Sequence, residues 1–433
     1  MRNCFCCNDE SCFNFKWKLN MKIAVITLGC KVNKYESDAL IFELKSRGIE
    51  ATDQLEEADA YIVNTCAVTN EAEKKSRQML ERVRKQNPNA KIYVMGCASQ
   101  NKPDKFLEKG AQFVVGTASK KKLLDELENM GHKRFDLPID YEDDLFSAQT
   151  LTRAFIKIQD GCNHFCTYCL IPYLRGRSRS RSMGSILQEV ERLPEEVKEI
   201  VFVGIDVSDF QIDGQKGLGL LLEKSDKYNK RLRLSSMEDN LIDEEFLKTL
   251  KSLKNFCPHF HLSLQSGSDN VLKKMNRKYT TQQFAQSVEN IRKVFPNAGI
   301  TTDIIVGFPT ETDEDFEDTL KFVEKVKFSQ LHIFPYSKRD GTTASKLYKD
   351  LSGDIKISRL KKLEAVGERL KKEFISSNKT GKVLIEEKVG DCFVGYTENY
   401  IRCFLKEEVK IGQVVDVKIL KPFKNGALAE KLK

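Results

Sequence analysis

Three cysteines stand close together in the segment "DGCNHFCTYCLIP", in the spacing C-x3-C-x2-C. Cys162, Cys166 and Cys169 offer three soft thiolates within eight residues, a set that suits an iron–sulfur cluster or a zinc ion. Structural zinc sites usually take two separated pairs of ligands, and no second pair of this kind follows in the chain. We therefore favour a cluster, whose fourth ligand is still to be explained; zinc with His164 is the alternative.

Three further cysteines are far apart in sequence but occupy equivalent places. Cys30, Cys66 and Cys97 each end a stretch typical of a buried parallel strand: "KIAVITLGC", "DAYIVNTC" and "KIYVMGC". Neighbouring strands lie about 4.8 Å apart, so three strand ends bring such thiols together at one edge of a sheet. A buried cysteine is often only a small core residue, but three at equivalent strand ends favour a second cluster.

The elements around these three cysteines alternate between strands and helices. A fourth strand is expected at "AQFVVGT". Two capping boxes are expected to begin the helices after the first and second strands, at Asn33 with Glu36 and at Asn70 with Glu73. The alternation predicts a doubly wound parallel sheet over residues 21–135.

From about Thr152 the alternation of strands and helices begins again, with six predicted strands separated mostly by helices. The strands are "AFIKIQ", "EIVFVGIDV", "RLRLSS", "HFHLSLQ", "ITTDIIVGF" and "QLHIFPYS". Thr312 is expected to cap the helix before the last of them, and a long helix is expected over residues 355–374. Six βα units predict an open barrel over residues 148–378, with function at the C-terminal ends of its strands.

The last part of the chain changes to short strands and turns. "KVLIEEKV", "CFVGYTENYIRCFL" and "QVVDVKIL" predict a small β-barrel over residues 379–433. The expected architecture is therefore α/β, with a doubly wound sheet, an open (βα)6 barrel and a small β-barrel in that order.

Composition is typical of a globular protein without a membrane segment. Hydrophobic residues make up 40% of the 433, and no apolar run reaches the ~18 residues of a membrane span. Residues 1–20 lack the apolar stretch of a secretory signal, so we expect a cytoplasmic protein. For the "CFCCNDESC" within them we favour a disordered extension or an unused upstream start over the alternative, a metal-binding knuckle. Thirteen cysteines then favour metal ligation over disulfides, and the net charge of +8 permits a polyanionic partner.

The three-cysteine segment, placed after the first strand of a six-stranded barrel, resembles the radical S-adenosylmethionine (SAM) superfamily. In that superfamily the three cysteines hold three irons of a [4Fe–4S] cluster, and SAM chelates the open fourth iron. Reduction of the cluster then yields a 5′-deoxyadenosyl radical. The resemblance implies that Tyr168, just before the last cysteine, lies near the adenine; ordinary loop packing is the alternative.

Two three-cysteine sites followed by a small β-barrel resemble the methylthiotransferases. The local sequences "TLGCKVNKYES", "VNTCAVTNEAEKKSRQ", "LSLQSGSDNVLKKMNRKYT" and "DIIVGFPTETDEDF" are similar too, and the resemblance covers Met21 to the C-terminus. It implies two [4Fe–4S] clusters, with the inserted sulfur associated with the second, and a TRAM-like, RNA-binding terminal barrel. "KVN" after the first Gly-Cys is most similar to the MtaB type, which modifies N6-threonylcarbamoyladenosine at position 37 of tRNA.

The resemblance also implies a reaction and partners. The radical removes hydrogen from C2 of that adenosine, sulfur bonds to the carbon, and a second SAM supplies the methyl group. The implied partners are the tRNA anticodon stem-loop, an electron donor such as flavodoxin or ferredoxin, and a sulfur donor. The alternatives are the same chemistry on isopentenyladenosine or on a ribosomal-protein aspartate, and, from another class, a non-catalytic iron–sulfur protein that binds RNA.

Two groups of residues are candidates for substrate and cofactor contacts. The segment "LRGRSRSRS" places arginines at alternate positions, which in an extended chain face one way and suit phosphates, unless some pair with barrel carboxylates. These arginines are Arg175, Arg177, Arg179 and Arg181. Cofactor contacts are expected near the C-terminal ends of barrel strands, where turns and caps are the alternative, from Asp206, Ser236, Gln265, Asp303 and the backbone of Gly307.

Overall fold

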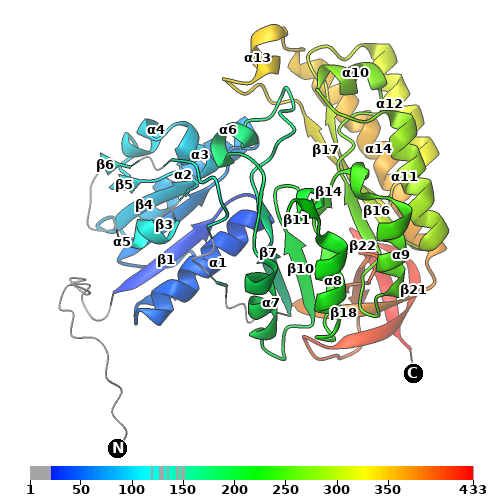
Figure 1. Cartoon of the computed structure of the whole chain (residues 1–433), viewed down its shortest axis with the longest axis horizontal. Helices are drawn as coiled ribbons and strands as arrows, with labels where there is room; N and C mark the ends of the chain where they lie inside the picture. Colours follow the sequence, from blue (N-terminus) through cyan, green and yellow to red (C-terminus); the bar gives the residue numbers. More distant parts are fainter. Residues whose placement is uncertain are drawn as a thin grey trace, which may run out of the picture.

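The computed structural model describes residues 21–118, 120–125, 131–133, 136–142, 146–147 and 152–432. The N-terminal segment "CFCCNDESC" therefore lies outside the described residues. The described chain forms, in sequence order, a parallel sheet, an open barrel and a small closed β-barrel (Figure 1). Within this part of the chain, no helix has the length and apolarity that a membrane crossing needs.

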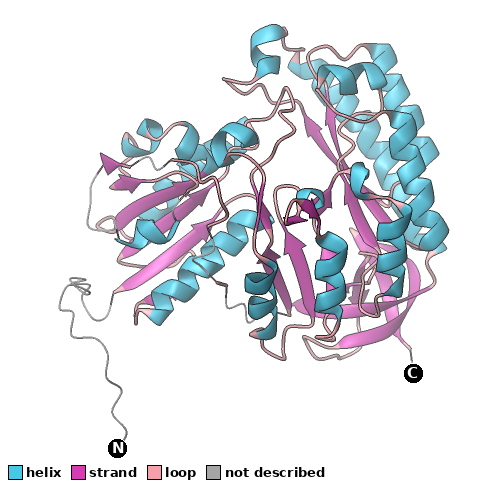
Figure 2. Ribbon diagram, in the orientation of Figure 1, coloured by secondary structure: helices cyan, strands magenta, loops and turns pink. Residues whose placement is uncertain are grey.

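The N-terminal sheet has the strand order β2-β1-β3-β4-β5-β6, and every neighbouring pair is parallel. Helices cover both of its faces (Figure 2), which explains why the strand Ala60–Thr65 is buried along its whole length. Its elements are β1 (Lys22–Thr27), α1 (Lys31–Ser46), β2 (Glu50–Thr52), β3 (Ala60–Thr65), α2 (Asn70–Gln86), β4 (Lys91–Gly96), α3 (Cys97–Asn101), α4 (Asp104–Leu107), β5 (Phe113–Val114), α5 (Lys120–Asp125) and β6 (Gly131–His132).

The predicted capping box at the start of α1 is wrong. α1 begins after Cys30, whose side chain makes no capping hydrogen bond. The amide of Asn33 donates to the Leu28 carbonyl at 2.8 Å, and Glu36 accepts from Arg175 at 2.9 Å. Both side chains are therefore used at the junction between the sheet and the barrel rather than at the helix end.

The second predicted capping box is also wrong, although the helix is in the expected place. Thr69 caps α2 by accepting a hydrogen bond from the Ala72 amide at 3.1 Å. Arg339, from the barrel part of the chain, donates to Asn70 at 2.5 Å and to Glu73 at 2.7 Å. Asn70 and Glu73, which the local pattern predicts to form the cap, therefore bind Arg339 instead.

The central part of the chain is an open barrel of parallel strands. β7-β10-β13 form one sheet and β14-β15-β16-β17 another, and β14 follows β13 after a single residue. Within the described residues β7 and β17 do not pair, so the predicted open barrel is confirmed. The strands are β7 (Arg153–Lys157), β8 (Gln159–Asp160), β9 (Arg179–Ser180), β10 (Glu199–Val203), β11 (Gln211–Ile212), β12 (Gln215–Lys216), β13 (Arg231–Leu234), β14 (Ser236–Met237), β15 (His259–Leu262), β16 (Gly299–Val306) and β17 (Gln330–Pro335).

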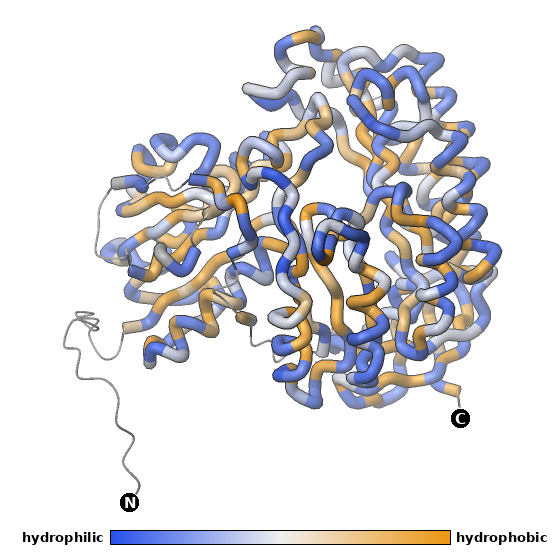
Figure 3. Tube along the Cα trace, in the orientation of Figure 1, coloured by the Kyte–Doolittle hydropathy of each residue, from blue (hydrophilic) through white to orange (hydrophobic). Residues whose placement is uncertain are grey.

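Helices pack on the outside of these strands, along which the apolar residues run (Figure 3). Thr312 caps α12 in a capping box with Asp315, as the sequence predicts. The long helix extends from Gly353 to Ser377, slightly beyond its predicted ends. The helices are α6 (Ile171–Arg175), α7 (Met183–Glu191), α8 (Leu218–Asp226), α9 (Glu244–Ser252), α10 (Asp269–Lys274), α11 (Thr281–Val294), α12 (Asp313–Val326), α13 (Thr343–Leu347) and α14 (Gly353–Ser377), with short 3-10 turns at Val207–Asp209 and Asp239–Leu241.

The C-terminal residues form a closed barrel in the order β18-β19-β20-β22-β21. Its strands are β18 (Thr380–Val389), β19 (Cys392–Tyr396), β20 (Arg402–Leu405), β21 (Val414–Phe423) and β22 (Gly426–Lys431). The predicted small β-barrel is thus confirmed, with β22 as a strand that the sequence pattern did not reveal.

Buried charges attach the small barrel to the N-terminal ends of the open barrel's strands. Arg233 is 1% exposed and donates to Glu199 at 2.8 and 3.0 Å. It also donates to the carbonyl oxygens of Thr397 at 3.1 Å and Glu398 at 3.0 Å, in the loop after β19. A buried charge is tolerated only when it is paired, so these bonds fix where the small barrel sits.

Replacement of Arg233 is expected to loosen this attachment. Arg233→Met leaves two buried carbonyls without a donor and should lower the free energy of unfolding by about 3 kcal/mol, measured by urea denaturation. Arg369→Met, which removes an exposed arginine paired with Glu324 and Glu373, is the control and should leave the denaturation midpoint unchanged. Equal midpoints for the two variants would contradict the assignment.

Candidate functional site

The loop between β8 and α6 carries Cys162, Cys166 and Cys169 at the C-terminal ends of the barrel strands. One N–H group is directed at each sulfur. The backbone amides of His164 and Ile171 donate to Cys162 at 3.5 Å and to Cys169 at 3.4 Å. The third sulfur, that of Cys166, accepts from the Arg277 guanidinium at 3.4 Å. Donors of this kind stabilise thiolates, the form in which cysteine binds metals.

Burial has a large effect on these thiols. It raises the pKa of Cys162 and of Cys169 to about 12, and that of Cys66 to about 11. Such thiols stay protonated and unreactive until a cation binds and displaces the proton. The donor set therefore fits a metal cluster better than a nucleophilic cysteine.

The other three cysteines meet at the C-terminal edge of the N-terminal sheet. Cys30 follows β1, Cys66 follows β3 and Cys97 follows β4, and these strands are neighbours. Each thiol lies close enough to the other two to interact with them electrostatically. Gly29 has a positive φ of 103°, and a Cβ there would lie 2.9 Å from the sulfur of Cys66, so only glycine leaves room. The structure thus brings the three thiols together; their role as ligands stays a prediction.

The two cysteine groups face each other across the junction of sheet and barrel. α6, directly after the cysteine loop, packs against α3, which begins at Cys97. Leu170 and Leu174 belong to the apolar core on that face of the N-terminal sheet. Cys169 is near enough to Cys97 for the two sulfurs to interact electrostatically. The segment that holds one cysteine group is therefore part of the core that supports the other.

The zinc alternative with His164 does not match the geometry. His164 Nε2 lies 2.9 Å from Asp206 Oδ2, and that contact raises the pKa of His164. Among the described residues, the only three potential ligands whose donor atoms all lie within 4.8 Å of one another are His164, Asp206 and Glu238. Neither cysteine group is so compact, whereas a single zinc ion holds its sulfurs at about 2.3 Å. The wider spacing suits a cluster of several irons.

The predicted row of exposed arginines is not present. Arg175 ends a helix instead of lying in an extended chain, and it is 1% exposed. Arg181 is also 1% exposed and pairs with Glu189, while Arg179 contacts Asp160 at 3.3 Å. The prediction that these three face RNA was wrong, because their guanidinium groups form ion pairs with carboxylates from other segments.

Arg177 differs from the other three arginines. It is exposed, and its guanidinium lies 4.4 Å from the centre of the Phe165 ring. Tyr173, 53% exposed, meets the same ring edge-on at 5.6 Å. RNA contact by Arg177 stays a prediction.

A cavity of about 230 Å³ lies where the N-terminal sheet meets the mouth of the barrel. It brings together three of the residues that the sequence singled out, namely Tyr168, Gln265 and Asp303. Burial acts to raise the pKa of Asp303, but the hydrogen bond and charge of His261 outweigh it and lower the pKa. The full lining is Val68, Thr69, Tyr168, Gln265, Asp303, Ile305, Phe334, Pro335, Tyr336 and Ser337.

The remaining candidates have other surroundings. Ser236 is not among the lining residues of this cavity and pairs with His261 in the sheet. Asp206 caps the short turn that follows it by accepting from the Ser208 amide at 3.1 Å. A Cβ on Gly307 would lie 2.5 Å from Lys356, so this glycine makes room for the Lys356 side chain; its approach to a cofactor stays a prediction.

Sequence reasoning missed Arg277 and the charges around Arg175. Arg277 lies 111 residues after Cys166 and reaches its sulfur only through the fold. Nothing in the spacing of "MNRKYT" marks that contact. The sequence pattern around Glu36 was misleading, because it is typical of a capping box and gave no indication that Glu36 binds Arg175.

Comparison with known sequences covers nearly the whole chain. Residues 156–323 match the radical SAM superfamily, and residues 22–116 match the uncharacterized protein family UPF0004. Threonylcarbamoyladenosine tRNA methylthiotransferase MtaB of Bacillus subtilis is 38% identical over 432 residues, which cover 93% of this chain and 95% of that protein. The protein of the same name from Aquifex aeolicus is 37% identical, over 92% of this chain and 100% of its own length.

A relative with another name is almost as similar. The tRNA-2-methylthio-N(6)-dimethylallyladenosine synthase of Thermodesulfovibrio yellowstonii is 34% identical over 423 residues, covering 92% of this chain and 96% of that protein.

Solved structures share the fold at low sequence identity. The radical SAM methyltransferase TsrM from Kitasatospora setae superposes with a TM-score of 0.53 at 13% identity, over 75% of this chain and 74% of that one. The radical SAM enzyme OxsB, without its cofactors, gives a TM-score of 0.54 at 12% identity, over 80% of this chain and 56% of that one. With the relatives above, the chain belongs to the MtaB-type methylthiotransferases of the radical SAM superfamily.

Proposed function

We propose that the protein is a tRNA methylthiotransferase that converts N6-threonylcarbamoyladenosine at position 37 to its 2-methylthio derivative. The observation that carries this proposal is the pair of cysteine groups on facing elements, Cys97 on α3 and Cys169 just before α6. Insertion of sulfur at an aromatic C–H needs both a radical source and a sulfur carrier. Two adjacent cysteine groups in one chain would supply a place for each of them.

The cysteines would hold two [4Fe–4S] clusters, one at Cys162, Cys166 and Cys169, and one at Cys30, Cys66 and Cys97. When bound and reduced, the first cluster together with SAM supplies a carbon radical strong enough to remove hydrogen from C2 of adenosine. The protein itself positions SAM and the target base and excludes water from them. Tyr168, Gln265 and Asp303 line the cavity at the mouth of the barrel and are proposed to contact SAM or the target base; Ser236 is the weakest of the four candidates.

Arg177 and the terminal barrel are proposed to contact the tRNA anticodon stem-loop. Arg177 is exposed next to the cysteine loop, and within the described residues its guanidinium makes no ion pair that a phosphate would have to displace. Two tyrosines of the small barrel are already stacked within the protein. Tyr400 already stacks on His259 at 4.3 Å and on Tyr396 at 4.6 Å.

The substrate assignment rests on relatives. Five relatives, at 33–38% identity, are named as threonylcarbamoyladenosine enzymes, the first four of them at 37–38%, and three at 34–36% are named as dimethylallyladenosine enzymes. The second candidate substrate is therefore isopentenyladenosine in tRNA. The proposal also includes an external electron donor, such as a flavodoxin or ferredoxin, a sulfur donor, and a cytoplasmic location with the tRNA pool.

Removal of either cysteine group is expected to halve the bound iron. Reconstituted protein should hold about eight irons, from two four-iron clusters. Changing Cys162, Cys166 and Cys169 to Ala should leave about four and abolish formation of 5′-deoxyadenosine with dithionite and SAM. Changing Cys30, Cys66 and Cys97 to Ala should also leave about four, yet keep SAM cleavage. Stoichiometric zinc in place of iron at both sites would rule out the scheme.

The substrate is identified by the modification that disappears with the gene. In tRNA from a deletion strain, nucleoside mass spectrometry should show threonylcarbamoyladenosine in place of its 2-methylthio form. The isopentenyladenosine derivative in the same digest serves as the internal control and should stay methylthiolated. If the isopentenyladenosine derivative loses its methylthio group instead, the second candidate is the substrate.

A further inference from the structure

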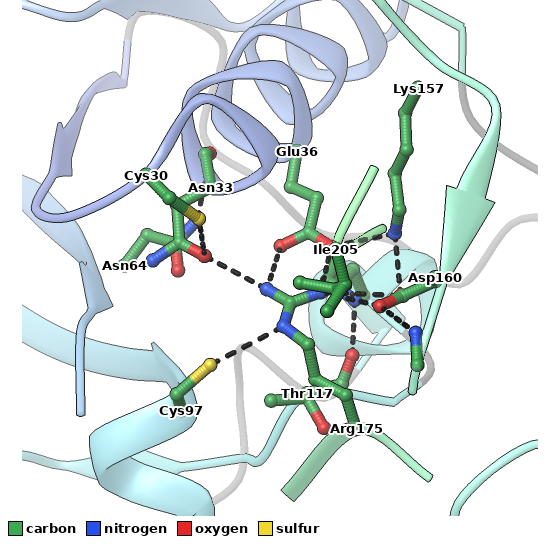
Figure 4. Close-up of polar contacts among 12 residues, drawn as sticks. Cys30, Asn33, Glu36, Asn64, Cys97, Thr117, Lys157, Asp160, Arg175 and Ile205 are labelled. Carbon is green, nitrogen blue, oxygen red and sulfur yellow. Dashed lines mark hydrogen bonds and ion pairs between the residues drawn. The ribbon is translucent and has the colours of Figure 1, made fainter. Parts of the chain in front are cut away.

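Arg175 lies at the junction of sheet and barrel, where Figure 4 shows its guanidinium among Asn33, Glu36 and Cys97 of the sheet and Asp160 of the barrel. Its guanidinium is buried and its N–H groups are all directed at partners. Nη1 donates to Glu36 at 2.9 Å and to Asp160 at 3.0 and 3.2 Å. Nη2 donates to Asn33 at 2.8 Å and to Glu36 at 3.2 Å. Bidentate contacts of this kind fix both the position and the plane of a guanidinium.

The fifth N–H group of Arg175, at Nε, is directed at a cysteine. Nε of Arg175 donates to the sulfur of Cys97 at 3.4 Å, so the fixed guanidinium is aimed at a proposed cluster ligand. Asn33, which accepts from Nη2, is also 3.7 Å from the sulfur of Cys30. Arg175 itself follows Cys169 by six residues. The last residue of α6, the helix after the cysteine loop, thus contacts the cysteine group of the N-terminal sheet.

The ion pairs around Arg175 are rich in positive charge. Glu36 is contacted by Lys120 at 3.2 Å and by Lys157 at 2.8 Å. Asp160 is contacted by Lys157 at 2.7 Å and by Arg179 at 3.3 Å. As far as the described residues go, four cations thus share two carboxylates in these contacts. Glu142 lines the same cavity as Lys120, Lys157 and Arg179 and is a third carboxylate there, so an excess of about one positive charge is left, which is costly in a buried place unless negative charge lies nearby.

A four-iron cluster held by three thiolates brings that negative charge, and reduction increases it. We infer that Arg175 is a positioning residue that holds the Cys30/Cys66/Cys97 cluster and stabilises its reduced form through the Nε–Cys97 contact. This inference rests on the proposed function, because it needs a cluster at that site. A purely structural ion pair would hold the junction together without changing the electron affinity of the cluster.

The test measures the reduction potential of that cluster alone. The full-length protein with Cys162, Cys166 and Cys169 changed to Ala is titrated with dithionite, and the reduced cluster is followed by electron paramagnetic resonance. Adding Arg175→Gln removes a positive charge beside Cys97. The ratio of reduced to oxidised cluster at a fixed potential should fall about tenfold, which is a shift of about 59 mV to lower potential.

Two further variants separate charge from structural damage. Glu36→Gln removes a negative charge from the same guanidinium and should shift the potential in the opposite direction, to higher values. Arg175→Lys keeps the charge and should stay close to the parent protein. The matched control is Arg359→Gln, because Arg359 is also buried and paired with a glutamate, Glu311, but contacts no cysteine among the described residues.

The outcomes distinguish the inference from the proposed function. Shifts of opposite sign for Arg175→Gln and Glu36→Gln, with none for Arg359→Gln, support it. An unchanged potential in Arg175→Gln, or shifts of the same sign in both variants, overturns it. If Arg175→Gln assembles no cluster, the sign of the Glu36→Gln shift decides alone. If the parent protein with only Cys30, Cys66 and Cys97 holds no cluster at all, the proposed function itself fails.

Discussion

Buried charge at the junction of sheet and barrel determines how the two cysteine groups are placed. Glu36 comes from the first helix of the sheet, and Asp160 and Arg175 flank the cysteine loop of the barrel. None of the three has access to solvent that could replace a lost partner. A buried ion tolerates little displacement, because each ångström of separation costs electrostatic energy in a medium of low dielectric constant. These contacts therefore oppose displacement of the sheet relative to the barrel.

Apolar packing strengthens the same junction. The residues after the cysteine loop leave the barrel and enter the core of the sheet, where Leu170 and Leu174 pack. Arg339 makes a second, separate link by binding Asn70 and Glu73 on α2. Both groups of thiols are therefore organised by contacts that do not involve iron.

The sequence predicted the parts of this molecule that depend on local pattern. Continuous apolar runs indicated the parallel strands, and strand ends were enough to bring Cys30, Cys66 and Cys97 to one edge. It failed where a side chain has a partner far away in the chain. Glu36 and Glu73 sit at positions typical of helix caps, yet arginines from the barrel bind them. The alternating arginines satisfied an extended pattern, but helix α6 and three buried carboxylates removed Arg175, Arg179 and Arg181 from the surface.

The attachment of the small barrel at the strand starts has a consequence for the size of the substrate. Gly299, the first residue of β16, is in close contact with the Asn399 backbone of the small barrel, whereas the other end of β16 leads to the mouth where Asp303 lines the cavity. Asp303 is the fifth residue of β16 and lies about 13 Å along the strand from Gly299. A ligand that touches both the small barrel and the cavity must extend at least that far, as a folded stem-loop does.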